Sequence, residues 1–121
     1  MRIIPTRNFN DNVEFYIRKK KYKKIYGDIK TVTDELEKGN LLGVKLEGLH
    51  IPEDTAVYKV LIANTSANVG KSHGFELIYY VVIEEKIYLL AIYSKKDDIC
   101  VVTEKTIESY IKILLKQESE E

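Results

Sequence analysis

The residues best suited to chemistry lie in a polar stretch of ten residues, Asn64–His73, between two apolar runs. Its Gly70–Ser72 segment resembles the end of a phosphate-binding P-loop, and His73 is of a residue type that often serves in acid–base catalysis. A P-loop also needs a glycine five positions before Gly70 and a helix after the motif, whereas Thr65 is present and a strand is expected to follow. The stretch therefore argues against nucleotide hydrolysis and predicts a loop that presents polar side chains, although a purely structural role for His73 stays open.

A second candidate for phosphate binding is a group of basic residues early in the chain. The group consists of Arg18, Lys19, Lys20, Lys21, Lys23, Lys24 and Lys30. The formal net charge of the whole chain is zero, but a local basic stripe can still attract phosphate. The alternative is a solvated helix face whose lysines only confer solubility.

Composition places the chain among ordinary globular proteins. Its 121 residues predict a single domain spanning 1–121, and 45% hydrophobic with 31% charged residues is typical of a folded soluble protein. No apolar run approaches the roughly 18–20 residues of a membrane span, and the start of the chain has no signal-peptide pattern, so a cytoplasmic location is expected. The single Cys100 excludes an internal disulfide and a multi-cysteine zinc site.

Hydrophobic periodicity predicts the elements that must position these residues. Arg2–Pro5 is a short apolar run whose proline confines it to the edge of a sheet. Helical spacing then predicts two helices, the first capped by Thr6 and the second ended by Gly39, with the basic group in their connection. Gly27 and Asp28 either kink the second helix or start it, with Asp28 as the cap.

Strands and a last helix complete the chain. Strands are expected at Tyr58–Ala63, Phe75–Ile83 and Ile87–Ser94, because β-branched and aromatic residues dominate these runs. Thr103 is expected to cap the last helix, whose apolar stripe should dock either on its own sheet or on a partner. The layout predicts an α+β fold in which two N-terminal helices pack on one face of a mainly antiparallel sheet of four or more strands, plus a C-terminal helix.

The alternation of side chains along the strands assigns residues to the two faces of this sheet. Because lysine and glutamate are poor core residues, Lys59 and Glu76 are expected to mark an open face. Tyr93 differs from the other tyrosines because it stands at a strand end beside Lys95 and Lys96.

Two stretches carry a family resemblance: YKVLIANTSANVGKSHGFELIYYVV and IYLLAIYSKKDDI. Together they resemble the RelE/ParE superfamily of toxins from type II toxin–antitoxin systems, in the branch with a Gly-Lys-Ser-Gly-Gly-like loop. The matching positions are Tyr58, Lys59, Gly70, Lys71, Ser72, Gly74, Tyr80, Ile92, Tyr93 and Lys95. The PTRNF start, the KKKY segment and Gly43 also follow the family's order of elements, so the resemblance spans nearly the whole chain.

The resemblance implies a RelE-like fold and a metal-independent ribonuclease that cuts mRNA on the ribosome, without a small-molecule cofactor, and that a cognate antitoxin protein silences. In such a site Lys59 and Lys95 would bind phosphate or transfer protons, and Tyr93 would stack on a base or donate a proton. The RNA-binding residues would be Lys71, His73, Lys96, Lys19, Lys20 and Lys21. The alternative is that Lys59, Lys71 and Lys95 are solvated surface lysines with no role in RNA binding or catalysis.

The chain departs from the family pattern at Leu61 and Glu76, which stand where the family has arginines. Loss of one preorganised charge-stabilising donor typically costs about 100- to 1,000-fold in rate, and the charge of Glu76 is expected to repel the scissile phosphate. The resemblance therefore implies an attenuated ribonuclease, whose activity should rise when both positions become arginine. The alternatives are a catalytically inactive RelE-like module that binds the antitoxin, and a ParE-like toxin that inhibits gyrase.

Overall fold

The computed structural model describes residues 1–83, 85–95 and 102–119. The elements in chain order are β1 (Arg2–Pro5), α1 (Arg7–Arg18), α2 (Ile25–Glu37), β2 (Val44–Lys45), β3 (Ala56–Ile62), the 3₁₀ turns η1 (Thr65–Ala67) and η2 (Lys71–His73), β4 (Phe75–Val82), β5 (Lys86–Ser94) and α3 (Glu104–Ser119). Lys96 and Cys100, which the sequence singled out, lie outside the described residues.

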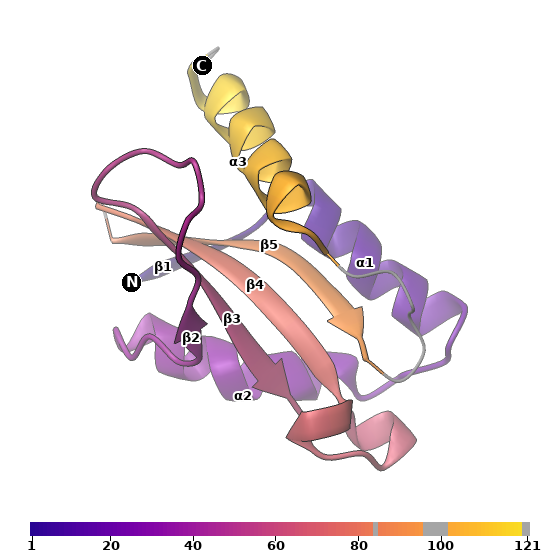
Figure 1. The fold of residues 1–121 in the computed structure, drawn as a ribbon. Helices are drawn as coiled ribbons and strands as arrows, with labels where there is room; N and C mark the ends of the chain where they lie inside the picture. The colour runs from indigo at the N-terminus through magenta and orange to yellow at the C-terminus, as the bar shows by residue number, and fades with distance from the viewer. Residues whose placement is uncertain (84, 96–101, 120–121) are drawn as a thin grey trace.

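The strands form a five-stranded sheet in the order β1-β5-β4-β3-β2 (Figure 1). β1 pairs with β5 in parallel, and the other neighbouring strands are antiparallel. The predicted α+β fold with a mainly antiparallel sheet is therefore confirmed. β1 also occupies an edge, as its proline requires, because proline has no N–H to donate to a second neighbour.

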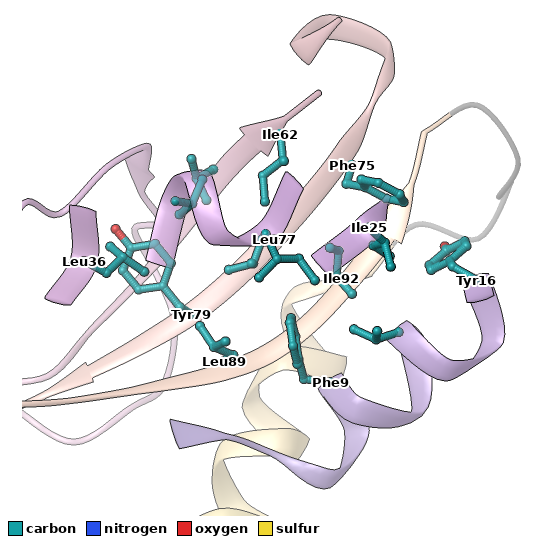
Figure 2. Close-up of a cluster of buried hydrophobic side chains, with 14 of the residues drawn as sticks. Phe9, Tyr16, Ile25, Leu36, Ile62, Phe75, Leu77, Tyr79, Leu89 and Ile92 are labelled. Carbon is teal, nitrogen blue, oxygen red and sulfur yellow. The ribbon is translucent and has the colours of Figure 1, made fainter. Parts of the chain in front are cut away.

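α1 and α2 cover one face of the sheet through a large hydrophobic core (Figure 2). Its buried members include Phe9 and Tyr16 from α1, Ile25 and Leu36 from α2, and Phe75, Leu77 and Tyr79 from β4. The caps are those that the sequence predicts: Thr6 accepts a hydrogen bond from the Phe9 N–H at 3.3 Å, and Gly39 follows α2 with a φ of 89°. Local signals therefore delimit both helices.

α3 packs on the opposite face of the sheet, which corrects the expectation that this face stays open. Ile107 and Ile111 are each 2% exposed, and they belong to a second core with side chains from β3, β4 and β5. Three partly buried residues of the β2–β3 connection pack against that core: Leu46, Leu49 and Ile51. The apolar stripe of the last helix thus docks on its own sheet, and Thr103 caps the helix by accepting from the Thr106 N–H at 3.2 Å.

Side chains of α1 complete the edge of β5 where β1 ends. The three hydrogen bonds are Asn8 Nδ2 to the Leu90 carbonyl at 2.9 Å, the Ile92 N–H to Asn12 Oδ1 at 3.1 Å, and the Ser94 N–H to the Tyr16 hydroxyl oxygen at 2.7 Å. The α1 residues in these bonds are four positions apart, a rise of about 6 Å along the helix, and the β5 residues are two apart, about 6.6 Å along the strand. The two spacings nearly match, so helix and strand stay in register over this length. The arrangement shields an edge that could otherwise pair with another chain.

Asn12→Ala should lower the free energy of unfolding by about 1–3 kcal/mol, because the Ile92 N–H loses its acceptor. Asn10→Ala is the matched control: Asn10 is exposed on the same helix, so both variants gain the same helix propensity. Urea unfolding of the two variants measures the difference. Equal midpoints would show that water satisfies the Ile92 amide in the variant.

Candidate functional site

Four residues singled out in the sequence meet on the face of the sheet that carries α3. Lys59 comes from β3, Glu76 from β4, and Tyr93 from β5, with Lys95 directly after β5. Glu76 pairs across the sheet with Tyr93, and the Lys95 N–H donates to the Gly74 carbonyl at 2.9 Å, which continues this pairing beyond the strand. We call these four residues the Glu76 cluster.

Glu76 is buried rather than displayed on an open face, which corrects the sequence-based expectation. The residue is 6% exposed and lies on β4, the central strand of the sheet. Its Oε1 is 3.4 Å from Lys95 Nζ and its Oε2 is 3.9 Å from Lys59 Nζ. The carboxylate is therefore held between the two lysines that the family resemblance assigns to phosphate.

The ion pairs of Glu76 are modest in strength. Both N···O distances exceed the usual range for hydrogen bonds, and the lysine side chains are 40% (Lys59) and 36% (Lys95) exposed, so solvent screens them. With both lysines and Glu76 charged, the three groups together carry one net positive charge. The cluster can therefore attract an anion, although Glu76 competes with that anion for the ammonium groups.

Leu61 lies directly opposite Glu76 in the pairing of β3 with β4. The two departures from the family pattern are therefore neighbours on adjacent strands, and an arginine at either position would join the cluster. Leu61 itself supplies no charge, so the cationic groups of the described cluster are its two lysines.

A cavity of about 310 Å³ adjoins the Glu76 cluster. Its lining residues are Lys45, Leu46, Glu47, Lys59, Ile78, Tyr93, Val102, Glu104 and Ile107. We call it the Lys59 cavity, because Lys59 and Tyr93 belong both to it and to the cluster. The N-terminal turns of α3 form one wall, and the connection after β2 forms another. Apolar side chains line much of it, and charges of both signs are present.

The first half of the polar loop is anchored to α2 by hydrogen bonds. Asp28 accepts from the Thr65 N–H at 3.1 Å and from the Thr65 hydroxyl at 2.8 Å, and Ser66 Oγ accepts from the Lys24 N–H at 2.9 Å. Asp28 thus lies inside α2 and anchors the loop instead of capping the helix, which corrects that interpretation. The first half of the loop is structural.

The second half of the loop forms η2, whose Lys71 and His73 are exposed. Ser72 Oγ lies 2.9 Å from His73 Nδ1. Strand β4 follows at Phe75, so the segment has the wrong context for a P-loop, as the sequence predicts. Lys71 lines a different cavity, on the α2 side of the loop.

Most of the early basic group lies in the connection between α1 and α2, whereas Arg18 ends α1 and Lys30 lies inside α2. Lys19, Lys20 and Lys21 are exposed in the connection, which confirms the predicted location. In Figure 1 this connection and η2 lie toward the same end of the sheet, where β3 and β5 end and β4 begins. The structure thus places the lysines of this connection and those of η2 at one end of the sheet.

Sequence reasoning missed three charged neighbours of Lys59. Lys45, Glu47 and Glu104 line its cavity from β2, the following connection and the start of α3. In the sequence they are ordinary charges of a connector and a first helical turn, with no spacing that marks a site. The pairing of β2 with β3 brings Lys45 and Glu47 to Lys59, and the docking of α3 adds Glu104.

Comparisons with known proteins found no match, so the resemblance to the RelE/ParE superfamily rests on the residues named above. No protein-family model matches the chain, and a search of curated proteins returns no significant match. Among the residues that the structure describes, no helix is long and apolar enough to cross a membrane, and no group of three or more histidine, cysteine or acidic residues could hold a metal ion.

Proposed function

We propose that this chain is the toxin of a type II toxin–antitoxin pair and that it cleaves mRNA on the ribosome at an attenuated rate. The observation that carries the proposal is the convergence of Lys59, Tyr93 and Lys95 around Glu76, next to a cavity that can take part of a substrate. The family resemblance points to the same three side chains. A cognate antitoxin would bind the protein in the cytoplasm and keep it silent.

The cluster supplies the cations and a proton donor for RNA cleavage without a metal. The ribose 2′-oxygen passes its proton to a solvent water and attacks the phosphorus, the bond to the 5′-oxygen breaks, and that leaving oxygen takes a proton. Lys59 and Lys95 would stabilise the negative charge of the phosphorane, and Tyr93 would stack on a base or donate the proton. The exposed polar side chains at the end of the sheet, Lys71 and His73 among them, would bind the RNA backbone.

Glu76 explains why the activity would be reduced rather than lost. A phosphate must displace its carboxylate from both lysines, and each screened ion pair is worth about 1 kcal/mol at most. Two such pairs correspond to roughly 30-fold in rate, since 1.4 kcal/mol is about tenfold. Both lysines keep their positive charge, so the site can still stabilise the phosphorane and cleave RNA slowly.

Lys59→Ala and Lys95→Ala should each slow mRNA cleavage by roughly fivefold, because each removes one screened positive charge from the phosphorane. Primer extension on an mRNA translated in a purified system measures the rate. Lys112→Ala, an exposed lysine on α3, is the control and should cut at the unmodified rate. Unchanged cleavage in both variants would show that the active site lies outside the Glu76 cluster.

A second candidate is a RelE-like module that binds its antitoxin without catalysis. The burial of Glu76 between both lysines favours it, because the carboxylate already neutralises part of the site. Induction of the protein in cells separates the candidates: growth arrest with mRNA cleavage supports the nuclease, and growth arrest without cleavage supports gyrase inhibition. Capture of a neighbouring small protein on co-expression, with neither effect, supports the binding module.

A further inference from the structure

We propose that the Lys59 cavity is a nucleobase pocket that selects guanine. The inference deepens the proposed function, because it names the base that lies beside the scissile phosphate. At about 310 Å³ the cavity is at the small end of the range for ligand pockets, roughly 300–1,000 Å³. It therefore suits one nucleotide rather than a peptide helix or a duplex.

The walls of the cavity suit the faces of a base. Leu46, Ile78, Val102 and Ile107 line it with aliphatic carbon, and Tyr93 contributes an aromatic ring. Single-stranded RNA is commonly bound by splaying a base onto such surfaces, with stacking on tyrosine among the usual contacts. The apolar lining therefore supplies affinity, while the polar groups must supply selectivity.

The polar groups of the cavity match the edge of guanine. An ionised carboxylate only accepts hydrogen bonds, so Glu47 and Glu104 favour a base with N–H donors on its edge. Guanine presents two adjacent donors, N1–H and the N2 amino group, which match the two oxygens of one carboxylate. Lys45 can donate to the guanine O6, an acceptor that adenine replaces with an amino group.

The position of the cavity fits a nucleotide whose phosphate lies at the Glu76 cluster. Lys59 lines the cavity, and its Nζ is 3.9 Å from the Glu76 carboxylate. A base in the cavity would therefore place its own phosphate near Lys59 and Lys95. Tyr93, which also belongs to both, would lie between base and phosphate.

The test is the affinity of the full chain for the four nucleoside 3′-monophosphates, measured by NMR titration. The guanosine nucleotide should bind about tenfold more tightly than the adenosine nucleotide, the size of one charge-assisted hydrogen bond. Glu47→Gln with Glu104→Gln should reduce the guanine preference to about threefold, because the Lys45 contact to the guanine O6 remains. Glu53→Gln, an exposed glutamate in the β2–β3 connection, should leave the preference unchanged.

Equal affinities in the unmodified chain, or an undiminished guanine preference in the double-glutamine variant, would overturn the pocket. The same measurements distinguish the two proposals. If the chain cleaves mRNA but shows no preference for guanine, the guanine pocket is wrong and the proposed nuclease activity stands. Guanine-selective binding without cleavage supports the pocket and overturns the nuclease. Short single-stranded RNAs with one guanine among adenines distinguish an RNA site from one for the free nucleotide.

Discussion

Glu76→Gln should raise mRNA cleavage by roughly 30-fold, provided that the Glu76 cluster is the active site. The substitution keeps the shape of the side chain and removes the charge that holds Lys59 and Lys95 at 3.9 and 3.4 Å. Both lysines then become free to pair with the scissile phosphate. Two screened ion pairs of about 1 kcal/mol each set the size of the effect.

Cleavage of a translated mRNA, followed by primer extension at limiting enzyme, measures this gain. Glu53→Gln controls for the loss of one negative charge far from the cluster, and should leave the rate unchanged. A loss of cleavage in Glu76→Gln would show that the carboxylate itself takes a proton in the reaction. An unmodified chain that already cuts at full rate, with no gain from glutamine, would show that the active face lies elsewhere.

Leu61→Arg combined with Glu76→Arg extends the same reasoning. The two positions face each other across β3 and β4, so the variant adds two guanidinium groups where the family pattern has them. Cleavage should rise further, and Lys59→Ala in this background should remove the gain. Because an arginine at position 76 lies between two lysines, the variant should also unfold at a lower urea concentration. Rate and stability are therefore measured on the same preparations.

Gly74→Ala should lower the free energy of unfolding by at least about 3 kcal/mol. A Cβ at this position would lie 2.1 Å from the Ile62 carbonyl oxygen and 2.9 Å from the Asn64 backbone nitrogen. Both atoms belong to the main chain at the end of β3, so relief requires moving that backbone. Gly74 is thus needed for close packing of the chain on itself.

Gly70→Ala is the matched control from the same loop. A Cβ added at Gly70 would meet no atom within 4 Å outside the residue and its two chain neighbours, and the φ of −76° is one that alanine adopts freely. Its stability should stay within about 0.5 kcal/mol of the unmodified chain. Urea midpoints of the two variants decide the point, and similar midpoints would mean that β3 can shift at little cost.

Periodicity and capping signals in the sequence determined the elements themselves. Thr6 and Thr103 cap the helices that they were expected to cap, and Arg2–Pro5 forms an edge strand. These signals succeed because they are local: the spacing of apolar residues assigns one face of one element, and a cap needs only its own first turn. The α+β class follows from the order of the elements.

The tertiary structure alone decided which side of the sheet each element covers. The apolar stripe of α3 would fit either face, and its docking beside β5 closes the face that holds Lys59. Glu76 is buried because β4 has a partner on each side and lysines from both flanks reach its carboxylate. Burial and charge pairing depend on contacts between elements, whereas hydrophobic periodicity can be seen within a single element. For that reason the sequence marks Glu76 as a departure, and the fold makes it the centre of the candidate site.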